Sequence, residues 1–73
     1  MVSKKETLEK LGVLIHHWIS HNDEHAREYR KWAERLEAEG LVEIAGKIRE
    51  AADLVAASND PFLSAQEKLR VAR

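Results

Sequence analysis

The chain has 73 residues, no cysteine, one proline and three glycines, and its 12 basic and 13 acidic residues leave a net charge of −1. The absence of cysteine excludes disulfide bonds and thiolate metal ligands and fits a cytoplasmic protein. The balanced charge gives no electrostatic reason to expect a nucleic acid or an anionic membrane as partner. Ala, Leu, Glu, Lys and Arg dominate, and no apolar run approaches the roughly 18 residues of a membrane span, so we expect one helical domain over residues 1–73.

A first helix is predicted over residues 4–39. Ser3-Lys4-Lys5-Glu6 is a capping box, in which the serine hydroxyl accepts a hydrogen bond from the backbone three residues on. Apolar residues then recur at alternating spacings of three and four, which is a heptad seam. The seam is Leu8, Leu11, Ile15, Trp18, Asn22, His25, Tyr29, Trp32 and Leu36, with Leu14, Ile19, Ala26 and Ala33 beside it. Gly40 is expected to end this helix, which is about 50 Å long, as a left-handed C-cap.

A second helix is predicted over residues 41–72, bent or broken near Pro61. Its seam is Leu41, Ala45, Ile48, Ala52, Val55, Asn59, Phe62, Gln66 and Leu69. The seam keeps its phase through the stretch 58–61, which favours one helix bent at Pro61 over a short third helix capped by Asp60.

The expected fold is all-α, a long antiparallel helical hairpin with its turn at Gly40. Two helices bury one seam each, which is marginal for a chain of this size. We therefore expect a homodimer that forms a coiled-coil-like four-helix bundle.

All four histidines lie between residues 16 and 25, and three of them are four residues apart. His17, His21 and His25 each step about 40° around the helix axis, so they form what we call the histidine ladder, whereas His16 points about 100° away. His17 and His25 are about 12 Å apart along the axis, so both must lean towards an ion near His21. That T-shaped donor set suits Ni(II) or Cu(II) better than tetrahedral Zn(II), and ligands from a partner subunit are the alternative.

Other residues flank this candidate metal site without being proposed as primary ligands. Trp18 lies in the seam beside the ladder, where it can exclude water or face the cation. Glu24 and Glu28 can add an oxygen ligand or hold a ring nitrogen, and their mutual repulsion is one that a bound cation relieves. His16 is adjacent to the site but outside the ladder. Because imidazoles bind metal when neutral, affinity is expected to fall below about pH 6.5.

Residues 21–25 also spell H-x-x-E-H, the inverted zincin peptidase signature, in which Glu24 acts as general base. A peptidase needs a third zinc ligand and a substrate cleft as well, so we expect no enzyme and keep a metallohydrolase as a minor alternative. The main alternative is a helical protein–protein interaction module whose histidines are an incidental or pH-sensing surface.

The segment from His17 to His25 reads H-W-x-x-H-x-x-x-H. It resembles the nickel-binding motif of the CooJ-type nickel accessory proteins, which serve carbon monoxide dehydrogenase maturation and are helical, coiled-coil dimers. The resemblance implies Ni(II) as the ion, with His17, Trp18, His21 and His25 in the motif positions. It also implies a metallochaperone role towards a nickel-enzyme client. The residues alone leave Ni(II), Cu(II) and Zn(II) open, and copper is favoured on affinity.

Overall fold

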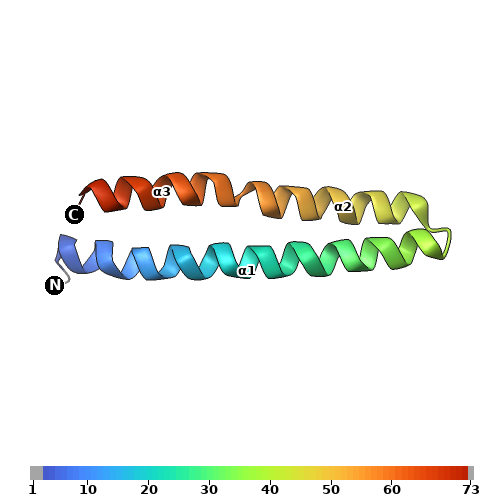
Figure 1. The fold of residues 1–73 in the computed structure, drawn as a ribbon, viewed down its shortest axis with the longest axis horizontal. Helices are drawn as coiled ribbons and strands as arrows, with labels where there is room; N and C mark the ends of the chain where they lie inside the picture. The colour runs from blue at the N-terminus through green and yellow to red at the C-terminus, as the bar shows by residue number, and fades with distance from the viewer. Residues whose placement is uncertain (1–2, 73) are drawn as a thin grey trace.

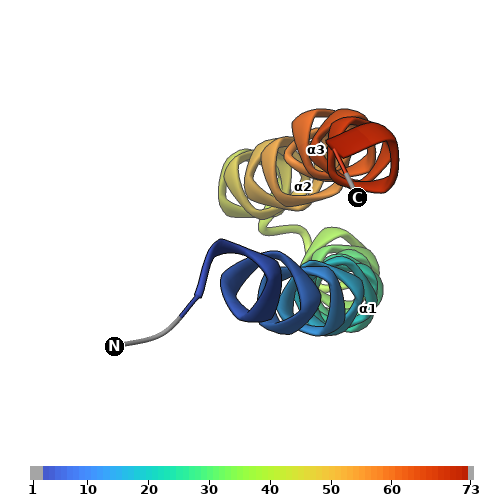
Figure 2. The same ribbon diagram turned by 90° about the vertical axis from the view of Figure 1, so that its left-hand side faces the viewer.

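The computed structural model describes residues 3–72 and contains three helices, α1 (Lys4–Ala38), α2 (Val42–Ala57) and α3 (Asn59–Ala72). α1 runs antiparallel to α2 and α3, which follow one another nearly in line (Figure 1). The end-on view shows two helical columns side by side (Figure 2), and the rod measures 54 × 18 × 15 Å. The predicted all-α hairpin is therefore confirmed. Among residues 3–72 no helix is long and apolar enough to cross a membrane.

The two ends of α1 are closed by local hydrogen bonds. At the start, the Ser3 hydroxyl accepts a hydrogen bond from the backbone N–H of Glu6 at 3.1 Å, as the capping box predicts. At the end, Gly40 has a φ of 83°. The N–H of Gly40 donates to the carbonyl of Glu37 at 3.0 Å, and the N–H of Leu41 donates to that of Leu36 at 2.9 Å. This is a Schellman motif, and it reverses the chain into the hairpin.

The second column is broken at Ser58, three residues before Pro61, so the bend is not at the proline itself. A proline ring clashes with the carbonyl of the residue four positions earlier, and for Pro61 that residue is Ala57, where α2 ends. Pro61 then lies in the first turn of α3, where its missing N–H costs no helical hydrogen bond. The Ser58 hydroxyl donates to the Val55 carbonyl at 2.6 Å across the break.

The core between the columns is thin and consists mainly of alanine. The buried apolar residues are Ile15, Ala26, Ala33, Ala45, Ala52 and Leu69. Because alanine side chains are short, the two helices can approach closely, and no space remains between them for a large ring.

The tryptophans of the predicted α1 seam are outside this core, which corrects the prediction. Trp18 is 37% exposed and Trp32 is 53% exposed, whereas Ala26 and Ala33, which were expected only to flank the seam, are buried. At these two positions the buried residue therefore comes one residue after the predicted one, whereas Ile15 of the predicted seam is buried as expected. The predicted seam of α2 and α3 is better matched, with Ala45, Ala52, Asn59 and Leu69 buried.

Candidate metal centre

The histidine ladder lies near the middle of α1, and its rings follow one another along the helix. The ring centroids of His17 and His21 are 5.7 Å apart with an interplanar angle of 15°. Those of His21 and His25 are 4.3 Å apart at 61°. The run continues to Tyr29, whose ring stacks on that of His25 at 5.8 Å and 17°. Sequence reasoning had placed Tyr29 in the core and missed this fourth ring, although it follows His25 at the same spacing of four.

Exposure changes along the ladder as the helix geometry requires. His17 and His21 are exposed and His25 is half-buried, because each step of four residues turns about 40° around the axis. His16 is exposed and takes no part in the ring stacking. Within residues 3–72, no imidazole makes a hydrogen bond or an ion pair. The rings of His17 and His21 are therefore free to change rotamer without losing a polar partner.

Trp18 lies beside the ladder but packs across the hairpin. Its ring centroid is 5.7 Å from that of Phe62 in α3, with an interplanar angle of 46°. This contact joins α1 to α3 at the level of the ladder, so Trp18 contributes to packing whatever else it does. Glu24 and Glu28 are exposed on the flank of α1, and neither bonds to an imidazole within the described residues.

One chain does not gather a complete ligand set. Within residues 3–72, no three histidine, aspartate or glutamate side chains are grouped so that they could hold a metal ion. The reason is geometric: His17 and His25 are about 12 Å apart along the axis, and the rings follow one another along the helix, the first pair stacked and the second edge-on, instead of converging on one point. His21 and His25 are the closest pair of imidazoles, so they are the core of any site that ring rotation or a second chain completes.

A polar network crosses the hairpin between the last two rungs of the ladder. The side-chain amide of Asn22 donates to the Ser58 hydroxyl and to Asn59 Oδ1, both at 3.0 Å. The amide of Asn59 donates to Asp23 Oδ1 at 2.9 Å. Asn22 and Asp23 are variable positions of the H-W-x-x-H-x-x-x-H pattern, yet they attach this part of α1 to the break between α2 and α3. Sequence reasoning had placed Asn22 and Asn59 on the two seams but had not paired them.

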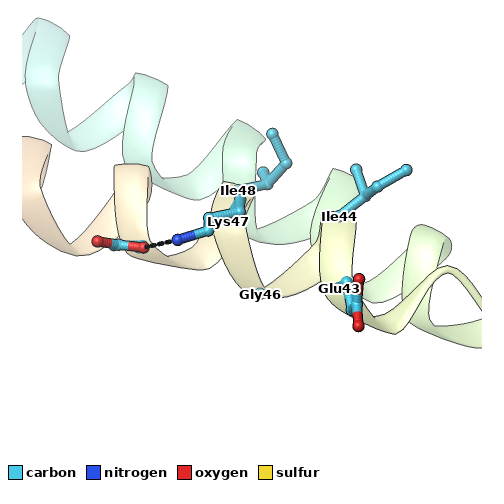
Figure 3. A pocket seen from close by; sticks show the side chains of 6 residues that line it. Glu43, Ile44, Gly46, Lys47 and Ile48 are labelled. Carbon is cyan, nitrogen blue, oxygen red and sulfur yellow. Dashed lines mark hydrogen bonds and ion pairs between the residues drawn. The ribbon is translucent and has the colours of Figure 1, made fainter.

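A separate surface depression lies elsewhere, near the hairpin turn. Figure 3 shows that it lies along α2, where it is lined by Glu43, Ile44, Gly46, Lys47, Ile48 and Glu50. Its polar groups are carboxylates and one ammonium, and Lys47 is paired with Glu50 at 3.4 Å. It contains no imidazole and is separate from the ladder, so it is not part of the candidate metal centre.

A protein-family model matches residues 11–69 of the chain, which include the whole ladder and both seams apart from Leu8. The chain belongs to the DUF8180 family. The family is described as a domain of unknown function, so membership carries no ligand or activity with it. No curated protein matches the chain. No solved structure matches it either.

Proposed function

We propose that the protein binds a divalent transition-metal ion, Ni(II) first, through His17, His21 and His25, and serves as an accessory protein in nickel delivery. The observation that carries the proposal is the unbroken run of imidazoles on one helix, with ring centroids 5.7 and 4.3 Å apart. Neutral imidazole is a good ligand for nickel and copper, and these rings have no polar partner of their own within residues 3–72. No catalytic step is part of the proposal.

A homodimer belongs to the same proposal because one chain lacks a group of three ligands within its described residues. The His21–His25 pair from each of two chains supplies four imidazole nitrogens, which is the number that square-planar coordination needs. In the alternative, His17 swings towards His21 within one chain. Glu24 and Glu28, exposed on the same helix, are the side chains that we propose to support a ring nitrogen in either arrangement.

The likeness to the CooJ-type motif supports Ni(II) over Cu(II) as the biological ion and suggests a nickel-enzyme client. His17, Trp18, His21 and His25 occupy the motif positions in this chain, and His16 occupies none. Since copper binds such sites more tightly in general, preference for nickel inside a cell would come from metal availability and from the client.

Titration calorimetry with Ni(II) tests the proposal. His21→Ala removes the central rung and should weaken binding roughly tenfold or more, because it leaves only the outer imidazoles, which are about 12 Å apart along the axis. His16→Ala is the matched control, since it removes an exposed imidazole from the same helix and should bind as the wild type does. Stoichiometry reports the arrangement: one ion per two chains supports the shared site, and one ion per chain supports the single-chain site. Equal binding by wild type and His21→Ala contradicts the proposal.

A second candidate function is a helical protein–protein interaction module with no metal. The observation in its favour is the number of large apolar side chains left in solvent, Trp32 among them at 53% exposure. Native mass spectrometry with and without Ni(II), Cu(II) and Zn(II) separates the two candidates. If the protein is only an interaction module, wild type and His21→Ala should carry the same amount of bound metal.

A further inference from the structure

The two long faces of the hairpin differ in chemistry. On the face that we call the polar face, side chains of α1 reach across to α2 and α3 through ion pairs and hydrogen bonds. Arg30 pairs with Asp53 at 3.2 Å, and Glu37 pairs with Arg49. The Asp23–Asn59 hydrogen bond lies on this same side of α1. At about 100° per residue, the three α1 residues lie within about 40° of one another around the axis. The charged and polar groups that cross the polar face are therefore paired within one chain.

The opposite face, here the apolar face, has aromatic and aliphatic side chains instead. It consists of Leu14, Trp18, His25, Trp32 and Leu36 from α1, and of Ile44, Ile48, Val55 and Phe62 from α2 and α3. The five α1 residues lie within about 40° of one another around the axis, roughly 140° from the ion-paired ones. Figure 3 shows Ile44 and Ile48 projecting from the same side of α2. Trp32 and Ile44 are each 53% exposed, and Leu14 and Trp18 are exposed as well, whereas the other five residues are half-buried, so this face is partly in solvent.

The apolar face has the same pattern in both directions along the rod, except that the counterpart of Ile44 across Val55 is the polar Gln66. In α1, Trp18 and Trp32 each lie seven residues from His25. In the other column, Ile48 and Phe62 each lie seven residues from Val55.

The two centres of this pattern lie at one level of the rod. Trp18 is seven residues before His25, Phe62 is seven residues after Val55, and the two rings are in contact at 5.7 Å. In antiparallel columns, equal steps from these contacting residues bring His25 and Val55 level with each other. A surface with this symmetry can match a copy of itself that is turned end for end.

We propose that a second copy of the chain packs on the apolar face about a two-fold axis that crosses the rod at the level of His25 and Val55. Trp18 of each copy then packs near Trp32 of the other, which is the reciprocal pairing that an isologous interface requires. From Leu14 to Leu36 the face is about 33 Å long at 1.5 Å per residue. The rod is 18 Å across, so the footprint is roughly 600 Å² per chain, which reaches the lower end of the about 1,200–2,000 Å² in total that specific interfaces bury. A net charge of −1 adds little repulsion between copies. The product is an antiparallel four-helix bundle.

The thin core explains why the second copy is needed. Four of the six buried apolar residues are alanines, so one hairpin removes little apolar surface from water. The inference rests on the homodimer part of the proposed function and not on the metal, so it is tested in a chelator, where loss of metal binding cannot be mistaken for loss of the dimer.

Sedimentation equilibrium in EDTA tests the face. Wild type should sediment at twice the chain mass of 8.4 kDa. Trp32→Glu and Ile44→Glu place a charge on the apolar face and should raise the dimer Kd roughly 30-fold or more, while circular dichroism stays helical. Leu54→Glu is the matched control, because Leu54 is 67% exposed on the side of α2 away from this face. A monomeric wild type, a trimer, or equal dissociation by Leu54→Glu overturns the proposal.

Cross-linking tests the direction of packing, since the natural chain has no cysteine. Val55→Cys puts a thiol at the proposed axis, next to its own copy, and a short bis-maleimide should couple the two chains. Leu54→Cys puts a thiol one residue away on the outer surface and should stay uncoupled. A dimer in which Val55→Cys couples no better than Leu54→Cys rules out the antiparallel arrangement.

Discussion

Asn59 of α3 donates a hydrogen bond to Asp23 of α1 at 2.9 Å. Asn59 is 8% exposed and is the one buried polar residue of the stretch 3–72. Its side-chain oxygen also accepts from Asn22 at 3.0 Å, so both ends of the amide are satisfied. A slip of the columns by one helical turn would leave these groups buried without partners, which costs more than an equivalent apolar mismatch. The network thus fixes the register of the histidine ladder against the break between α2 and α3.

Asn59→Ala should lower the free energy of unfolding by about 1–3 kcal/mol, because it removes the hydrogen bonds of Asn59 to Asp23 and Asn22 and leaves Asn22 only its bond to the Ser58 hydroxyl. Urea unfolding at one fixed protein concentration, followed by circular dichroism, measures the loss. Asp60→Ala is the control, since Asp60 follows Asn59 in the chain but its side chain is exposed and outside the network. An equal loss in both variants would mean that the network adds nothing beyond local helix propensity.

Two glycine substitutions should change stability in opposite directions. Gly40 has a φ of 83°, so Gly40→Ala forces a Cβ into the left-handed region and should cost about 1–2 kcal/mol. Gly46 lies inside α2, and a Cβ there meets nothing within 4 Å, so Gly46→Ala should stabilise the helix by about 0.5–1 kcal/mol. Thermal unfolding of the two variants beside wild type measures both. Destabilisation by Gly46→Ala would show that something outside the described contacts packs against that position.

Metal affinity should fall with acid. Binding requires neutral imidazoles, so protons compete with Ni(II) at each of the three ligands, and the apparent Kd for Ni(II) should rise roughly a hundredfold or more between pH 7.5 and pH 5.5. Titration calorimetry in matched buffers measures the profile. His16→Ala should follow the wild-type curve, since that imidazole lies outside the ladder. A flat profile would contradict histidine ligation and point to the carboxylates as ligands.

Glu28→Gln should have opposite effects on the stability of the metal-free helix and on the affinity for Ni(II). Glu24 and Glu28 are like charges four residues apart on an exposed flank, so removing one should stabilise the metal-free helix by a few tenths of a kcal/mol. The same change should weaken Ni(II) binding, because it removes a negative charge near the cation. Thermal unfolding with EDTA and with Ni(II) gives the two effects in one experiment. The same shift under both conditions would place Glu28 outside the influence of the ion.

The local structure of this protein was determined by its sequence alone. The capping box at Ser3, the left-handed turn at Gly40 and the ring spacing of His17, His21 and His25 all depend on residues a few positions apart. Such features follow from backbone geometry and a period of 3.6, whatever the helix packs against. For the same reason the all-α hairpin could be predicted before any contact was known.

Only the tertiary structure decided which side of α1 faces its partner. A stripe with alternating spacings of three and four can be drawn through Trp18 and Trp32 or through Ala26 and Ala33. The sequence pattern therefore did not show which stripe is buried. The alanines on the facing helix made the difference: two rows of short side chains let the columns close, and the large rings were left on the outside. The network around Asn59 could not be predicted from the sequence either. Asn59 is more than thirty residues from Asn22 and Asp23, and it meets them only when the register of the hairpin is set.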